Sequence, residues 1–279
     1  MTGNRIRDSK RNPFFQVKVK DGKYSTENQV SYYGKKLPDD TFSFDISNQK
    51  VQANLDEFGT IRHITFFHGN YLMESKPGVW VAKDFVQEHQ LSISVKWNGQ
   101  TEKLCEHTKY VETDLAENLF PRCRHYFPWG EVTILATAPI TAKGERLSCL
   151  LYEVTVKNKG REAAEMTVCL PALYEKKYSD TRNVLMITAE SGTYQDVSFT
   201  LQPMEQKRVS LLFGDPNRYQ DIEMFLSKDT DFWMEQTLQY FQSLTGELKM
   251  EEDAMAGMLL QRAYQQAFGA FAMSGENEI

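Results

Sequence analysis

The strongest constraint on the fold is an alternation of apolar and polar residues with a period of two, which runs from residue 42 to residue 213. In "LSISVKW" (91–97) every second residue is apolar, and an Asn98-Gly99 pair follows directly. Successive side chains on a strand point to opposite faces, so this period is typical of strands with one buried face. An Asn-Gly pair between two such runs predicts a tight hairpin.

The alternating runs are short, and turn residues separate them without any helical pattern in between. They cover residues 41–46, 51–55, 60–67, 91–97, 131–139, 147–158, 163–171, 184–188, 196–201 and 207–214. Strands in such a series pair in antiparallel order and bury their apolar faces against a second sheet. We therefore predict a mainly β protein built on a large antiparallel β-sandwich, followed by C-terminal linker helices.

The spacing of apolar residues becomes helical after Asp215-Pro216. Residues 217–244 predict either one long helix or two short ones, with Asp229 or Asp231 as the cap of the second.

A last helix follows the acidic stretch 251–253, and apolar residues cover most of its circumference. Such a helix is expected to be buried, and little chain follows to bury it. We divide the chain into a polar N-terminal segment (1–40), the sandwich (41–214), linker helices (215–250) and the start of a helical domain (251–279). The last segment is expected to pack poorly or to be covered by a neighbouring copy.

Composition limits the function classes. The net charge is −6 and the pI is about 5.5, so no broad basic surface is expected for nucleic acid or for a membrane. No apolar run has the length of a membrane span, and no signal peptide opens the chain, which predicts a cytoplasmic protein. The short basic start is interpreted as a frayed terminus; its cations are Arg5, Arg7, Lys10 and Arg11.

No nucleotide-binding, α/β-hydrolase or zincin motif is present, so no cofactor is predicted. His63 and His68 are five residues apart and would point to opposite faces of one strand, so no metal site is predicted either. The cysteines are predicted to be buried, reduced thiols; they are Cys105, Cys123, Cys149 and Cys169.

The segment most suggestive of a site is "NLFPRCRHYFPWGE" (118–131). Aromatic faces stack on sugar rings, and Arg or His side chains donate hydrogen bonds to hydroxyls or phosphate. On a strand, Arg122, Arg124 and Tyr126 would share one face, and His125 would lie on the other. Trp129 would lie at the turn that follows. The alternative is a sandwich strand with a cationic exposed face and a structural Trp.

A second segment, "KPGVWVAKDF" (76–85), offers Trp80 and Asp84 as the lining of a groove. The alternative is a core Trp and a strand-end Asp.

Paired carboxylates could also serve as a glycosidic acid and base. Glu131, Asp84 and Glu88 are candidates, and no feature singles one of them out.

Four segments together follow the pattern of one known family. They are "GVWVAKD" (78–84), "PRCRHYFPWGEVTILATAPITAKGERLSCLLYEVTVKNKG" (121–160), "LQPMEQKRVSLLFG" (201–214) and "FWMEQTLQYFQSLTGELKMEEDAMAGMLLQRAYQQAFGAF" (232–271). In this order they resemble the N-terminal part of family 94 glycoside phosphorylases, the cellobiose and chitobiose phosphorylase group. The resemblance covers roughly residues 40–273. Met204 stands where that family has Gly, and Gln261 where it has Asn.

The resemblance implies a galactose mutarotase-like supersandwich, linker helices and then an (α/α)6 barrel, of which residues 251–279 would be the start of a truncated copy. That barrel carries the general acid and the phosphate site, so no catalytic residue is assigned here. The resemblance also implies oligomer contacts and the rim of a sugar site, with an oligosaccharide or sugar phosphate, a second copy of the chain or a helical-barrel chain as partner.

Three functions follow as expectations. The first is a non-catalytic, carbohydrate-associated domain of a glycoside phosphorylase or hydrolase. The second is a complete mutarotase-like enzyme that uses His125 with Glu131 or Glu153 as acid and base. The third is an assembly module without a sugar role, in which the terminal helix docks on a partner.

Overall fold

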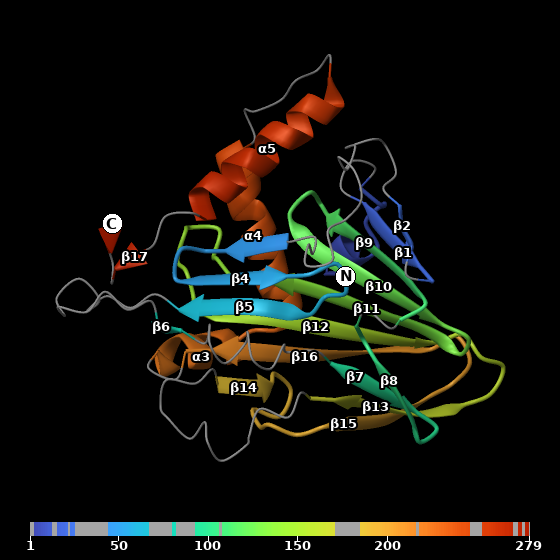
Figure 1. Ribbon diagram of the computed structural model, residues 1–279. Helices are drawn as coiled ribbons and strands as arrows, with labels where there is room; N and C mark the ends of the chain where they lie inside the picture. Colours follow the sequence, from blue (N-terminus) through green and yellow to red (C-terminus); the bar gives the residue numbers. More distant parts are fainter. Residues whose placement is uncertain are drawn as a thin grey trace.

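The computed structural model describes residues 3–12, 16–21, 23–25, 44–66, 80–81, 93–105, 108–170, 185–215, 218–245, 253–269, 273–274 and 277–278. The protein is mainly β, with large antiparallel sheets and helices toward the C-terminus (Figure 1). The predicted fold class, an antiparallel β-sandwich followed by helices, is therefore confirmed.

An eight-stranded antiparallel sheet forms the centre, in the order β14-β16-β12-β11-β10-β9-β1-β2. Its strands are β1 (Val17–Lys20), β2 (Lys23–Ser25), β9 (Tyr110–Ala116), β10 (Phe120–Phe127), β11 (Gly130–Thr137), β12 (Cys149–Asn158), β14 (Leu185–Thr188) and β16 (Gln206–Gly214). Strands β9 to β12 are consecutive in the chain and pair as a meander, whereas β16 pairs with both β12 and β14.

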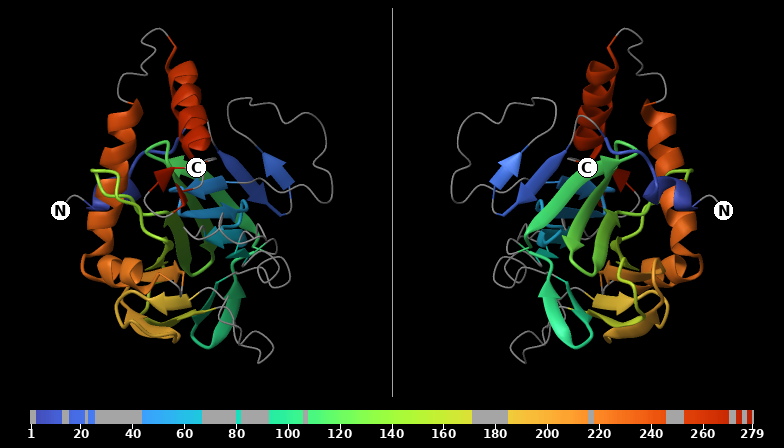
Figure 2. Two further views of the ribbon diagram at one scale, coloured as in Figure 1. Left: turned by 90° about the vertical axis from the view of Figure 1, so that its left-hand side faces the viewer. Right: turned by 90° about the vertical axis from the view of Figure 1, so that its right-hand side faces the viewer.

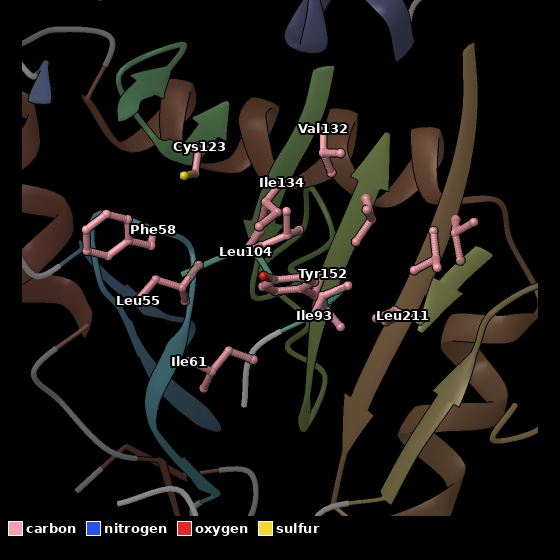
Figure 3. Packing of buried hydrophobic residues seen from close by; sticks show 14 of the residues in the cluster. Leu55, Phe58, Ile61, Ile93, Leu104, Cys123, Val132, Ile134, Tyr152 and Leu211 are labelled. Atoms are coloured by element: carbon pink, nitrogen blue, oxygen red, sulfur yellow. The ribbon is translucent and has the colours of Figure 1, made fainter. Parts of the chain in front are cut away.

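Two smaller sheets share one apolar core with the inner face of the large sheet. The first contains β3 (Phe44–Ser47), β4 (Val51–Leu55), β5 (Ile61–Phe66) and β6 (Trp80–Val81). The second contains β15 (Val197–Leu201), β13 (Ala164–Cys169), β7 (Ser94–Trp97) and β8 (Gln100–Lys103). Figure 3 shows Ile134 and Tyr152 of the large sheet pointing toward Leu55 and Ile61 of the first small sheet.

The predicted hairpin at Asn98-Gly99 joins β7 to β8, where Trp97 pairs with Gln100. Both turn residues adopt positive φ angles, 45° at Asn98 and 83° at Gly99, which is the conformation that this residue pair supplies at low cost. A further two-stranded sheet, β17 (Met273–Ser274) with β18 (Asn277–Glu278), follows the last helix.

A second apolar core lies on the outer face of the large sheet, under the helices α1 (Gly3–Arg7), α3 (Tyr219–Leu226) and α4 (Thr230–Thr245). Strand β12 has apolar side chains on both faces, so both faces of the sheet must be covered. Leu150 and Tyr152 point into the sandwich core, whereas Cys149 and Leu151 point into the second core. Figure 2 shows α1 and α4 together along one side of the strands. The helices after residue 215 therefore belong to the packed fold.

Asp229 separates α3 from α4, because its Oδ1 accepts a hydrogen bond from the backbone N–H of Phe232 at 2.7 Å. Of the two predicted possibilities, two short helices are therefore present. Asp253 caps α5 (Ala254–Gly269) in the same way, with its Oδ1 3.0 Å from the N–H of Ala256.

Helix α5 projects beyond the strands (Figure 1). Its buried residues are Gly257, Arg262, Gln265 and Gly269. By contrast, its large apolar residues Leu259, Leu260 and Tyr264 are 41%, 43% and 44% exposed. Its attachment combines polar contacts, such as the 3.0 Å hydrogen bond that Arg262 Nη2 donates to the carbonyl of Asp45, with aromatic contacts of Phe268 on Tyr240 and Phe241.

The N-terminal segment differs from its prediction as a frayed terminus. Ile6 of α1 is fully buried in the second core. Arg7 binds Glu153 at 2.5 Å and Asp231 at 2.6 Å, so two carboxylates distant in sequence hold this cation. Moreover, β1 pairs with β9 in the large sheet, and the sandwich therefore begins before residue 41.

Candidate functional site

A cleft of about 860 Å³ lies where the N-terminal segment, the β9–β10 turn, α4 and α5 meet. Amide side chains are its main polar groups, namely Asn12, Asn118, Gln242, Gln261 and Gln265. Apolar side chains form the rest of its wall, including Leu115, Leu119, Leu238, Phe241 and Met258. Charged side chains also line it, namely Lys10, Arg11 and Glu117.

Asn118 ties three walls of the cleft together. It lies in the tight turn between β9 and β10 with a φ of 58°, a conformation that Asn tolerates better than most residues. Its Oδ1 accepts a hydrogen bond from Asn12 Nδ2 at 3.3 Å. Its Nδ2 lies 3.1 Å from the carbonyl of Met258 and 3.4 Å from Gln261 Oε1. The turn thereby positions the N-terminal segment and α5 on either side of the cleft.

A smaller hollow of about 190 Å³ adjoins the cleft and shares Leu119, Phe241 and Gln265 with it. Arg262 lines this hollow, and burial lowers the pKa of its guanidinium to about 10. Arg262 therefore remains a cation at neutral pH. Its Nη2 donates to the carbonyl of Asp45 at 3.0 Å, and its Nη1 lies 3.4 Å from Gln265 Oε1.

The cleft chemistry suits a neutral, hydroxyl-rich ligand. Amide groups both donate and accept hydrogen bonds, as sugar hydroxyls do, and the phenyl ring of Phe241 offers an apolar face. The volume falls within the roughly 300–1,000 Å³ of typical small-ligand pockets. Glu117 is the single carboxylate among the described lining residues, whereas glycoside hydrolysis by the common mechanisms needs two.

The candidate segment 118–131 contributes Asn118 and Leu119 to this cleft, and its cationic and aromatic residues lie elsewhere. As predicted, Arg122, Arg124 and Tyr126 share one face of β10, and they pair with residues of β9 on the outer side of the large sheet.

Arg122 has no exposed surface, which excludes the predicted contact with a sugar. Its Nε and Nη2 bind the Asp114 carboxylate at 2.8 and 2.6 Å. Its Nη1 donates to the carbonyls of Arg7 and Ser9 at 3.0 and 2.9 Å, and its Nη2 to that of Lys10 at 3.3 Å. The guanidinium therefore fastens the N-terminal segment to the sheet.

His125 and Trp129 point into the sandwich core, which contradicts their prediction as sugar contacts. The His125 ring is fully buried, with Nε2 2.8 Å from the carbonyl of Phe58 and Nδ1 3.1 Å from Thr108 Oγ1. A carbonyl only accepts, so Nε2 carries the proton. Trp129 stacks on Phe127, with ring centroids 5.1 Å apart.

The acid–base pair of the mutarotase-like alternative is not assembled. His125 lies on the inner face of the sheet, whereas Glu131 and Glu153 lie on the outer face. Glu153 is engaged by Arg7 at 2.5 Å, and Glu131 by Lys159 at 2.6 Å. These side chains therefore cannot converge on one substrate.

The buried His125 predicts a pH dependence of stability. Burial lowers its pKa to about 4, whereas an unfolded chain has a His pKa of about 6.5. Between these values the unfolded state binds the extra proton, so stability falls as pH falls, by up to about 1.4 kcal/mol per pH unit for this group. Urea denaturation from pH 7 to pH 4.5 measures the slope, which we expect to shrink in His125→Gln. A His125 ring NMR signal that titrates near pH 6.5 would contradict the account.

Tyr126 and Arg124 remain partly accessible. The Tyr126 hydroxyl donates to Glu112 Oε2 at 2.9 Å, and burial followed by this hydrogen bond raises its pKa. Its ring stacks on Tyr110 with centroids 4.8 Å apart.

In the second candidate segment, Trp80 lies on β6, where its backbone pairs with Phe66. Asp84 and Glu88 lie outside the described residues.

Sequence reasoning identified Gln261 and Gln265 only as part of a family pattern and missed Asn12 and Gln242 as lining of a site. In the described part of the chain, no group of three or more His, Cys, Asp or Glu side chains is placed to hold a metal ion. Among the same residues, no helix is long and apolar enough to cross a membrane.

Comparisons with known proteins add no assignment. No model of a known protein family matches the chain, and no curated protein matches it significantly in sequence.

Proposed function

We propose that this chain is a non-catalytic, carbohydrate-binding β-sandwich domain of a protein related to family 94 glycoside phosphorylases, and that the oligosaccharide lies in the 860 Å³ cleft. The observation that carries the proposal is the amide-rich lining of that cleft, in which Asn118, Gln242 and Gln261 come from three separate elements. Amides at this density match the alternating donors and acceptors of a sugar chain.

The ordered resemblance of residues 40–273 supports the carbohydrate class. In the family that it resembles, a helical barrel carries out glycosyl transfer to phosphate or water. We propose such a barrel as the functional partner, and this domain as its support in sugar binding and in assembly with a second copy. All four cysteines are buried thiols, which favours a reducing compartment such as the cytoplasm.

The binding proposal is tested with a glycan array, followed by calorimetric titration of the best ligand. Gln242→Ala with Gln261→Ala removes two amides from different walls of the cleft. We expect affinity to fall about tenfold or more, because each hydrogen bond contributes about 0.5–1.5 kcal/mol net. Gln239→Ala, an exposed amide on α4 outside the lining, is the matched control and should bind like the wild type. Equal affinity for the double variant and the wild type would remove the cleft from the account.

A second function, assembly of copies through α5, is favoured by the exposure of Leu259, Leu260 and Tyr264 on its outward face. Light scattering over a range of protein concentrations distinguishes it. Under this alternative the wild type is an oligomer, and Leu260→Gln with Tyr264→Gln is a monomer. A monomeric wild type at every concentration would exclude it.

A further inference from the structure

A row of four polar side chains crosses the outer face of the large sheet where the helices leave it open. The strand register places Arg124 of β10 opposite Thr133 of β11, Thr133 opposite Thr155 of β12, and Thr155 opposite Arg208 of β16. Directly opposite residues of an antiparallel pair have Cβ atoms about 4.5–5.5 Å apart. Two hydroxyls therefore lie between two guanidinium groups, and all four residues line one hollow of about 240 Å³.

Arg124 carries a charge that the protein compensates poorly. Its side chain is 13% exposed, and its one ion pair in the described structure is a 3.5 Å contact with Asp114. That carboxylate is already bound by Arg122 at 2.6 and 2.8 Å. Burial, and then the charge of Arg122, lower the pKa of Arg124. Two guanidinium groups thus share one carboxylate, and most of the Arg124 donors have no acceptor among the described residues.

Two of the three acids that line the hollow, Glu153 and Glu131, are engaged by other cations. Arg7 binds Glu153 with two hydrogen bonds of 2.5 Å. Lys159 binds Glu131 at 2.6 Å. Asp8 lies at the exposed rim. Glu131 and Glu153 therefore pair with cations other than Arg124.

Two further polar groups of the hollow, on Thr155 and Lys157, are available to a ligand. The Thr155 hydroxyl and the Lys157 ammonium form no hydrogen bond or ion pair with the described residues, although both line the hollow. The Thr133 hydroxyl donates to Glu131 Oε1 at 3.2 Å. Arg208 uses Nη1 for Asp231 at 2.7 Å and is 38% exposed.

We propose that this hollow binds a tetrahedral oxyanion, a phosphate or phosphate monoester, held by Arg124 and the Thr155 hydroxyl with Lys157 and Arg208 contributing charge. A planar guanidinium matches two oxygens of such an anion, which adds direction to the charge attraction. The volume is below the roughly 300–1,000 Å³ of sites for larger organic ligands, which favours a small group. This site is separate from the carbohydrate cleft, which contains none of these four residues.

Thermal unfolding in sodium phosphate, compared with sodium chloride at equal ionic strength, tests the site. A ligand that binds only the folded state raises Tm in a saturable manner. We expect this rise for the wild type and a loss of the rise in Arg124→Gln and Thr155→Val. In chloride, Arg124→Gln should unfold at the same temperature as the wild type or higher, because it removes a poorly compensated cation.

Arg161→Gln is the matched control, since it removes one exposed arginine charge outside the hollow and should keep the full phosphate response.

Glucose 1-phosphate in place of phosphate separates two sources of the anion. A larger rise in Tm assigns the site to an organic phosphate, and a smaller rise assigns it to the free anion. Equal Tm values of the wild type in phosphate and chloride, or an unchanged phosphate response in both Arg124→Gln and Thr155→Val, would overturn the proposal. The Gln242→Ala, Gln261→Ala variant should keep the phosphate response. The proposal for the carbohydrate cleft and the proposal for the phosphate site are therefore tested independently.

Discussion

Arg122→Met is expected to lower the free energy of unfolding by about 3–5 kcal/mol, because it removes one partner of a fully buried ion pair. Asp114 would keep its charge in a site where the remaining cation, Arg124, lies 3.5 Å away. The carbonyls of Arg7, Ser9 and Lys10 would also lose the guanidinium that binds them. Urea denaturation followed by circular dichroism measures the loss.

The same variant should release the N-terminal segment, so limited proteolysis near residues 7–10 should accelerate. Adding Asp114→Leu to Arg122→Met should cost less than the sum of the two single changes, since the double variant leaves no unpaired charge. Arg161→Gln, at an exposed position, serves as the charge control and should change stability by less than about 0.5 kcal/mol. Wild-type stability of Arg122→Met would show that the pair does not fasten the segment.

Trp233→Ala is expected to cost about 3–5 kcal/mol as well, through the second core. Trp233 is buried between the sheet and α3, and its ring stacks on Phe225 with centroids 5.7 Å apart. Its Nε1 donates to the carbonyl of Phe225 at 2.8 Å. The truncation leaves a cavity and also removes the hydrogen bond that joins α4 to the end of α3.

Trp233→Phe keeps one aromatic ring in the core but loses the Nε1 donor and part of the indole packing, so we expect a smaller loss than for Trp233→Ala, of about 1–2 kcal/mol. Phe232→Ala is the neighbouring control, since Phe232 is only partly buried and packs at the margin of this core. A Trp233→Ala protein as stable as Phe232→Ala would mean that the helices add little to the stability of the sandwich.

The alternation pattern predicts individual strands well, and β4 begins and ends at the predicted residues Val51 and Leu55. It does not predict which elements cover the outer face of the sheet. Cys149 and Leu151 alternate with Leu150 and Tyr152, and all four are buried, so β12 lacks the one-sided pattern that marks a solvent-facing side. The second core depends on helices that follow the sandwich in sequence.

The N-terminal segment was misjudged for a related reason. Arg7 finds its partner Glu153 at a separation of 146 residues, and composition alone gives no sign of such a long-range pair. Strand β1 has only four residues, with Lys18 and Lys20 at every second position, which resembles a polar coil in sequence.

The candidate site was predictable only in part. The alternation of β10 correctly separates Arg124 and Tyr126 from His125, yet it cannot tell which face is the core. The cleft brings together Asn12, Asn118, Gln242 and Gln261. Amides distributed in this way carry no spacing signal, because different elements supply them.

The most direct test of the account is hydrogen–deuterium exchange of the whole chain with and without the oligosaccharide selected on the array. We predict slower exchange in the peptides that line the cleft, at residues 9–12, 115–119, 238–245 and 258–265. The Gln242→Ala, Gln261→Ala variant should lose this protection at the same ligand concentration. Protection confined to the strands around Arg124 and Thr155, or no protection at a saturating ligand concentration, would contradict the claim that this cleft binds carbohydrate.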